Sequence, residues 1–360
     1  MANPVATLQR TAAEYKSMDK KDKRRFWSDG ILNNALYILM LVFCVYTAIQ
    51  KPNFLSVTSL GNLIVQVAAY LPMALGIAGC IVLTGTDLSA GRAVGLTAAI
   101  TGAFLQRVDY ANKMLTMLPK VTPFWMFVTL LIVVAIGAVI GLVNGFFVAK
   151  FNLHPFIVTL ATQLITYGAL LIYLMQGTNN GQSISGLDTR YTDFITGSLF
   201  RIGATSIPNY VLYSLLITAL MWFIWNKTAF GKNMFAVGSN PEAANVSGVN
   251  VARTIILVFT LAGVMYGITG FIEAARIGSN SASTGLNYEL DAIAACVIGG
   301  VSFVGGIGRI GGVILGVVLL RIIFVGLTFL GIDSNLQYVI KGIIILAACA
   351  IDMRKYLVRK

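Results

Sequence analysis

Charged residues are scarce in this 360-residue sequence, since Asp, Glu, Lys and Arg together make up 11% of it. An ordinary soluble domain carries about 25%. A chain of this length with so little charge does not fit the pattern of a water-soluble globular protein. The sequence is instead rich in hydrophobic residues, which make up 57% of it, and its mean hydropathy is +0.80.

Histidine and cysteine are scarce as well. His154 is the single histidine and cannot build a metal site alone; because it precedes Pro155, we expect it to lie where a helix begins. The four cysteines lie inside apolar runs and none has a CxxC partner, which is typical of small buried hydrophobic residues. They are Cys44, Cys80, Cys296 and Cys349. No metal site is predicted.

A phosphate-binding loop of the form G-x-x-x-x-G-K-[ST] is absent from the sequence. The nearest stretch, "FGKN" at 230–233, lacks both the upstream glycine and the Ser or Thr. Any energy taken from ATP must therefore come from another chain. The net charge of +12 is also unaccompanied by the basic and aromatic alternation of strand-binding proteins, so no nucleic-acid partner is expected.

Long apolar runs are abundant. A membrane-spanning helix needs about 20 apolar residues, and runs of this length are too long and too uniform for barrel strands. We therefore predict an all-α polytopic membrane protein with about ten transmembrane helices. The ten segments are 31–50, 60–83, 89–106, 124–148, 155–175, 208–226, 254–273, 289–304, 309–330 and 336–352.

Basic residues predict the orientation. Residues 1–30 hold seven Lys and Arg, and the positive-inside rule places such a segment in the cytoplasm. The run from 31 is too long for a signal-peptide core. We expect a cytoplasmic tail at 1–30, a transmembrane domain at 31–352, and a second cytoplasmic tail at 353–360.

Two halves of the sequence show weak similarity. "GAVIG" at 137–141 resembles "GVILG" at 312–316, and "TDLSAG" at 86–91 and "ELDAIA" at 289–294 each place a carboxylate at the start of a Gly/Ala-rich segment. Spans two to five and seven to ten would then form an inverted repeat around a midplane pathway. The loop at 176–207 is long and polar, and is either functional or a connector.

A polar loop at 227–253 contains the signals of a short helix. Asn240 is a good N-cap, Pro241 suits the first helical position, Glu242 favours the first turn, and Gly248 favours a helix end. Ala243 and Ala244 provide a thin face. So short a helix is unstable alone in water. It lies either on its own protein or in the groove of a cytoplasmic partner.

Glu242, Ala243, Ala244 and then Gly248 resemble the EAA motif of ABC importer permeases. The stretches "WNKTAFGKNMFAVGSNPEAANVSGVNV" (225–251), "GTDLSAGRAVGL" (85–96) and "NYELDAIAACVIGGVSFVGGIG" (287–308) are similar to permease subunits of monosaccharide ABC importers. The resemblance spans about residues 35–355 and omits the N-terminal tail.

The resemblance implies a bacterial inner-membrane protein with both termini cytoplasmic, which is itself not an enzyme. It implies a second permease copy, two ATP-binding subunits or one tandem ATPase, and an extracytoplasmic sugar-binding protein. ATP and magnesium would be bound by the ATPase, so no cofactor is expected in this chain. The expected cargo is galactose or methyl galactoside, and ribose, xylose or a furanose signalling sugar are alternative cargoes. A proton-coupled sugar symporter is an alternative transport mechanism.

Polar residues inside the predicted spans are candidates for the pathway, because such residues are costly in a bilayer. The candidates are Asp87, Ser89, Asn144, Gln163, Glu289 and Asp291. Each has a structural alternative. Asp87 could cap the third span, and Asn144 and Gln163 could form hydrogen bonds between helices.

Overall fold

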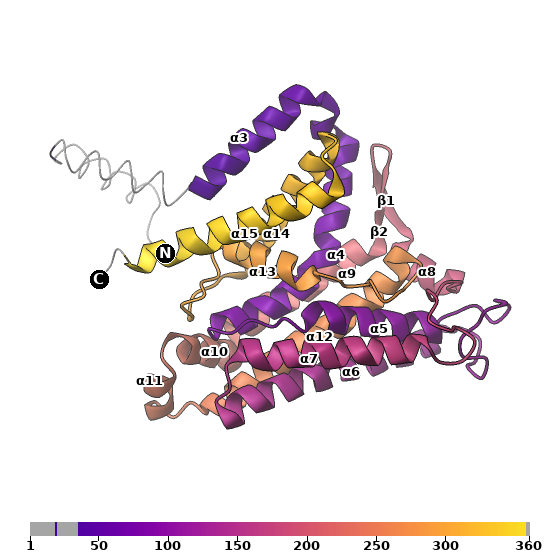
Figure 1. Cartoon of the computed structure of the whole chain (residues 1–360), viewed down its shortest axis with the longest axis horizontal. Coiled ribbons are helices and arrows are strands. Elements are labelled where there is room, and N and C mark those ends of the chain that lie inside the picture. The colour runs from indigo at the N-terminus through magenta and orange to yellow at the C-terminus, as the bar shows by residue number, and fades with distance from the viewer. Residues whose placement is uncertain (1–18, 20–34, 358–360) are drawn as a thin grey trace.

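A computed structural model of the chain describes Asp19 and residues 35–357 (Figure 1). The predicted tail at 1–30 lies outside the described residues apart from Asp19, as do residues 358–360 of the second tail. The helices and strands, in chain order, are α3 Ala35–Gln50, η1 Pro52–Leu55, α4 Val57–Val82, α5 Ala90–Phe104, α6 Pro123–Phe151, α7 Pro155–Leu174, α8 Thr189–Thr196, β1 Ser198–Ile202, β2 Thr205–Pro208, α9 Asn209–Lys227, α10 Ala229–Ser239, α11 Pro241–Val246, α12 Val251–Ile277, α13 Tyr288–Ile298, α14 Ile310–Phe329 and α15 Ser334–Leu357.

Each of the ten predicted apolar segments contains a helix. Within the described residues, six helices are long and apolar enough to cross a membrane, namely α4, α6, α7, α9, α12 and α14. The predicted segment 289–304 is wrong in length, because α13 ends at Ile298 and a non-helical stretch follows. At about 1.5 Å per residue, the 11 residues of α13 span only about half of the hydrocarbon layer. Residues 353–357 of the predicted second tail continue helix α15, which ends at Leu357.

Glycines allow a close contact between helices α6 and α12. Gly137 and Gly141 lie one turn apart on α6 and face Gly263 on α12. A Cβ on Gly137 would overlap the carbonyl oxygen of Gly263, and a Cβ on Gly141 would overlap that of Phe259. Small residues at this spacing let two membrane helices approach main chain to main chain.

The two long helices α4 and α12 each pack against helices from the other half of the chain. α5 and α6, which follow α4, pack against α12, whereas α13 and α14, which follow α12, pack against α4. Figure 1 shows α5, α6, α7 and α12 side by side, with α14 and α15 along another part of the bundle. Close glycine contacts recur here, because Gly312 and Gly299 bring α14 against the end of α13.

The long loop at 176–207 is folded and packs on the helix ends. It contains α8 and the antiparallel hairpin of β1 and β2. Main-chain bridges join Ile184 to Asn280 and Gln106 to Leu187, so three loops meet at this end. Tyr191 on α8 is fully buried and donates its hydroxyl to the carbonyl oxygen of Phe271 on α12. Burial raises the pKa of the Tyr191 hydroxyl well above its ordinary value, so this donor keeps its proton.

The opposite end carries α10 and α11 (Figure 1). The predicted polar loop at 227–253 therefore holds two helices, of which α10 was not predicted, and α12 begins within it at Val251. The Gly306 N–H donates to the carbonyl oxygen of Val82 at 2.8 Å. A Cβ on Gly238 would overlap that same oxygen. The ends of α4 and α10 and the loop after α13 thus meet through main-chain atoms.

The glycine contact between α6 and α12 can be tested with Gly141→Ala. We expect the added methyl group to destabilise the fold by about 1–3 kcal/mol, the usual cost of overpacking. The matched control is Gly168→Ala on α7, where a Cβ would meet no atom within 4 Å. Apparent melting temperature in detergent is the measurement. An equal effect of the two substitutions would contradict the proposed packing.

Candidate functional site

Charged side chains meet between α13, α14 and α15. Asp291, in the first turn of α13, lies 2.9 Å from Nη2 of Arg321 on α14 and 2.6 Å from Nζ of Lys341 on α15. Asp291 is 6% exposed and Arg321 7%. A buried carboxylate with two cationic partners is stable where a lone one is not. The sequence marked Asp291 as a pathway candidate but did not predict that it would pair with Arg321 and Lys341.

Aromatic rings hold Arg321 in place. Its guanidinium lies 3.6 Å from the ring centroid of Tyr70 on α4. The Tyr70 ring contacts that of Tyr288 at a centroid distance of 4.9 Å. The Tyr288 hydroxyl donates to Glu273 at 2.6 Å. Desolvated cation–π contacts of this kind are favourable and fix the guanidinium plane.

Glu273 and Arg276 form a second ion pair, on α12. Glu273 is 1% exposed. The pair was missed because the sequence analysis ended the seventh span at residue 273 and treated Arg276 as part of a loop. The spacing i, i+3 within "FIEAARIG" was the available signal, because residues three apart lie on one helix face.

Glu289 lies two residues from Asp291 and therefore points to a different side of α13, since successive helical residues are about 100° apart. Gln163 on α7 donates to Glu289 at 3.4 Å. The other carboxylate oxygen lies against Gly91 in the first turn of α5, where the helix dipole favours negative charge. Nearby, Arg92 donates to the carbonyl oxygen of Ala282 at 3.0 Å.

Asp87, Ser89 and Asn144 form a separate, fully buried cluster with Tyr266. Asp87 accepts from the backbone N–H of Ser89 at 2.9 Å, from its hydroxyl at 2.6 Å and from the Tyr266 hydroxyl at 3.1 Å. Asn144 donates to the Ser89 hydroxyl at 2.9 Å. The N-cap interpretation of Asp87 is wrong in position, because Ser89 is the residue that precedes α5.

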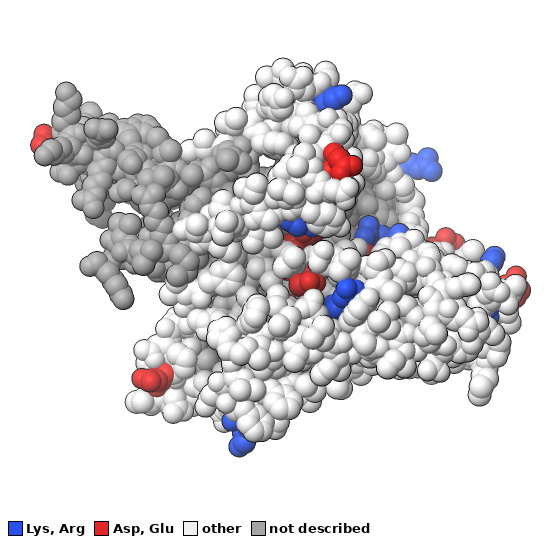
Figure 2. Space-filling view, viewed as in Figure 1, with Lys and Arg blue, Asp and Glu red and all other residues white. Residues whose placement is uncertain are grey.

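The six pathway candidates thus fall into three groups. Asp87, Ser89 and Asn144 lie in the core, Gln163 and Glu289 join α7 to α13, and Asp291 joins α13 to α14 and α15. Figure 2 shows red and blue atoms near the middle and at the edges of a largely uncharged face. In the described part of the chain, no group of three or more His, Cys, Asp or Glu side chains could hold a metal ion.

The predicted short helix is α11, Pro241–Val246. Asn240 accepts from the Ala243 N–H at 2.9 Å, as an N-cap does, and Pro241 is the first helical residue. Gly248 has φ +85, and the N–H groups of Gly248 and Val249 donate to Asn245 and Ala244. This is a Schellman ending, which the left-handed conformation of glycine favours.

One face of α11 packs on the protein and the other is free in this chain. Ala244 is 5% exposed, whereas Val246 is 89% exposed and Glu242 is exposed as well. Ala243 is also exposed, so only one of the two alanines packs inward. Glu242 and Val246 lie four residues apart and therefore on the same, exposed face of α11.

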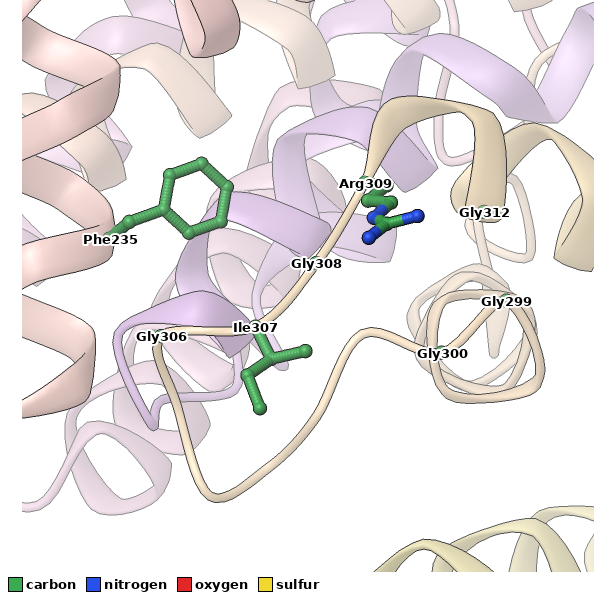
Figure 3. Close-up of a pocket in the computed structure, with 8 residues that line it drawn as sticks. All are labelled: Phe235, Gly299, Gly300, Gly306, Ile307, Gly308, Arg309 and Gly312. Atoms are coloured by element: carbon green, nitrogen blue, oxygen red, sulfur yellow. The ribbon is translucent and has the colours of Figure 1, made fainter. Parts of the chain in front are cut away.

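A cavity of about 430 Å³ lies at the same end of the molecule (Figure 3). Phe235 of α10 lines one side of it, and the loop from Gly306 to Arg309 lines another. Ile307 of this loop is 48% exposed. This end of the molecule therefore carries both the exposed face of α11 and a cavity beside α10.

Long apolar helices that pair their few charges inside the bundle are typical of the class of polytopic membrane proteins. Residues 59–349 match the family described as branched-chain amino acid transport system / permease component. The chain belongs to this permease family.

Relatives agree with this assignment over nearly the whole chain. The galactose/methyl galactoside import permease protein MglC of Escherichia coli (strain K12) is 44% identical, over 96% of this chain and 99% of the relative. That of Salmonella typhimurium is 46% identical with the same coverage. The ribose import permease protein RbsC of Bacillus subtilis is 33% identical, over 93% of this chain and 97% of the relative. No solved structure matches the chain.

Substitutions of Asp87 can distinguish a structural role of this carboxylate from a proton-carrying role. We expect Asp87→Asn to retain transport, because its amide oxygen can still accept from Ser89 and its amide NH2 group can donate to the Tyr266 hydroxyl oxygen in place of the second carboxylate oxygen. Asp87→Leu should reduce the amount of folded protein, since each unsatisfied buried donor costs about 1–3 kcal/mol. Uptake and membrane abundance are measured together. Loss of uptake in Asp87→Asn at normal abundance would contradict the structural role.

Proposed function

We propose that this chain is the transmembrane subunit of an ATP-driven importer that moves galactose or methyl galactoside into the cytoplasm. The observation that carries the proposal is the identity of 44–46% over nearly the full length to permeases named for that cargo. The ribose-import relative is less similar, at 33%. Ribose is therefore the second candidate cargo.

The proposed complex sits in the bacterial cytoplasmic membrane with both termini inside. It contains two copies of this chain, two ATP-binding subunits or one tandem ATPase, and an extracytoplasmic sugar-binding protein. ATP and magnesium are bound by the ATPase. The absence of a phosphate-binding loop from the sequence is consistent with this division.

Ten spans and an inverted repeat belong to the same proposal. The exchange of partners between the halves supports it, because α5 and α6 pack on α12 while α13 and α14 pack on α4. The loops at 105–122, 175–208 and 278–287 meet at one end of the bundle. The segments that follow α4, α9 and α13 meet at the other end, through the contacts among Val82, Gly238 and Gly306. This alternation is what ten crossings with cytoplasmic termini require.

The proposed mechanism begins with docking of the loaded binding protein on the outer loops. ATP binding then closes the ATPase subunits, which displaces α11 through the exposed face around Glu242 and Val246. The displacement moves α10 and α12 and opens the pathway inward, and hydrolysis resets the complex. This chain contributes no covalent chemistry. Energy passes to it only through protein contacts.

A proton-coupled symporter is the alternative from another class. It requires a carboxyl group that gains and loses a proton along the route. Asp291 is paired with two cations, and Asp87 accepts several hydrogen bonds in the core. These arrangements favour structural roles for Asp87 and Asp291. Glu289, whose second carboxylate oxygen is buried without a hydrogen-bond partner among the described residues, stays the candidate proton carrier of this alternative.

The cargo and the energy source can be tested in one experiment. We expect the chain, co-expressed with its neighbouring ATPase and sugar receptor in cells that lack their own galactose uptake, to accumulate labelled galactose. Unlabelled galactose should compete better than ribose. A protonophore should leave the ATP-dependent rate in vesicles unchanged. Uptake without any ATPase, or stronger competition by ribose, would overturn the corresponding half of the proposal.

The coupling role of α11 predicts the effect of Glu242→Lys. Reversing an exposed charge at a docking face should lower sugar uptake by about tenfold or more through weaker ATPase binding. Glu242 is exposed, so the fold should survive. The matched control is Asp109→Lys in the exposed loop at the other end, which should leave ATPase binding unchanged. Normal ATP-driven uptake in Glu242→Lys would discredit the coupling role.

A further inference from the structure

A small cavity of about 280 Å³ lies between α14, α15 and the first turn of α13. Ligand pockets in proteins usually measure about 300–1,000 Å³, so this one suits only a small molecule. It is lined by Asp291, Arg321, Lys341, Gln337, Tyr338 and Phe324, together with Ser334. The charges that line it are those of the ion-paired cluster.

The cavity extends from the middle of the proposed membrane layer toward the outer end. Arg321 is the twelfth of the 20 residues of α14, so at about 1.5 Å per residue it lies roughly half-way along that helix. Ser334 is the first residue of α15 and Gln337 follows within one turn. The cavity thus lies where a molecule from outside would reach the midplane.

The polar groups of the cavity include both donors and acceptors. The Arg321 side chain is buried, with 7% of the residue exposed. Its Nε has no hydrogen-bond partner among the described residues. Gln337 donates its amide to the carbonyl oxygen of Ile332 at 3.0 Å, which leaves its amide oxygen as an acceptor. Hydroxyl groups both donate and accept, so this mixture matches a polyhydroxyl ligand. A phosphate offers only acceptors, and the carboxylate of Asp291 would repel it.

An aromatic ring adds an apolar surface to these groups. Tyr338 is 55% exposed, and Nζ of Lys341 lies 5.1 Å from its ring centroid. A sugar ring carries C–H groups on its faces and hydroxyl groups at its rim. An aromatic side chain beside hydrogen-bonding groups is therefore complementary to it, because it combines an apolar body with polar contacts.

We propose that this cavity is a monosaccharide subsite of the transport route. Arg321, Asp291 and Gln337 contact sugar hydroxyl groups there, and Tyr338 packs against the sugar ring. The proposal rests on the import function proposed above. Ion pairing with Asp291 and the contact with Tyr70 hold the Arg321 guanidinium before the sugar arrives, so little ordering is needed on binding.

Gln337→Leu and Tyr338→Ala test the subsite in the complete importer, reconstituted in vesicles with its ATPase and sugar receptor. We expect each to lower galactose uptake about tenfold, as loss of a hydrogen bond or an apolar contact does. Receptor-stimulated ATP hydrolysis should stay within about twofold of wild type. The control is Val339→Ala, which is exposed on α15 and does not line the cavity.

A second measurement tests the subsite in case Gln337→Leu and Tyr338→Ala fail to assemble into an active importer. In Gln337→Cys, loaded receptor with ATP should slow labelling by a small thiol reagent, relative to empty receptor with ATP. Val339→Cys should show no such protection, and the wild-type chain corrects for native cysteines. If uptake and hydrolysis fall together in the first variants, protection of Gln337→Cys supports the subsite and its absence overturns it.

The two proposals fail in different ways. A wild-type complex that moves no galactose overturns the proposed function. A wild-type complex that moves galactose, while Gln337→Leu and Tyr338→Ala behave like Val339→Ala, overturns the subsite alone.

Discussion

Neutralisation of Asp291 is the constraint on which the arrangement of the last three helices depends. A carboxylate removed from water costs several kcal/mol unless cations and hydrogen bonds replace its hydration. Arg321 and Lys341 supply this from two different helices, at 2.9 and 2.6 Å. α13, α14 and α15 must therefore keep one register relative to each other. The same pairing keeps charge away from lipid and leaves polar groups beside a cavity.

Much of the helical pattern could be predicted from the sequence, because hydrophobic length is a local property. α11 was predicted with its cap and its end, since Asn240, Pro241 and Gly248 act on their own neighbours. The partners of Asp291 could not be predicted in this way. Arg321 is 30 residues away and Lys341 is further, and their meeting depends on helix packing. The contact between Tyr70 and Arg321 depends on packing in the same way.

Local rules also failed where the chain leaves regular structure. The segment after Ile298 is as apolar and as rich in glycine as several of the helices of this chain. It is not helical, because Gly300, Gly305 and Gly306 adopt positive φ and the chain turns there. Hydrophobicity alone does not distinguish such a stretch from a span. Similarly, α10 is amphipathic and short, and it is stabilised by its contacts with α9, α11 and α12 and by few signals of its own.

The junction of Gly238, Val82 and Gly306 has a mechanical consequence. These three segments touch through main-chain atoms, with the Gly306 N–H donating to the carbonyl oxygen of Val82 at 2.8 Å. Movement of one segment at such a junction must be followed by the others or taken up by their backbone torsions, because the contact is between main-chain atoms. A displacement of α10 is therefore passed to the end of α4 by direct main-chain contact.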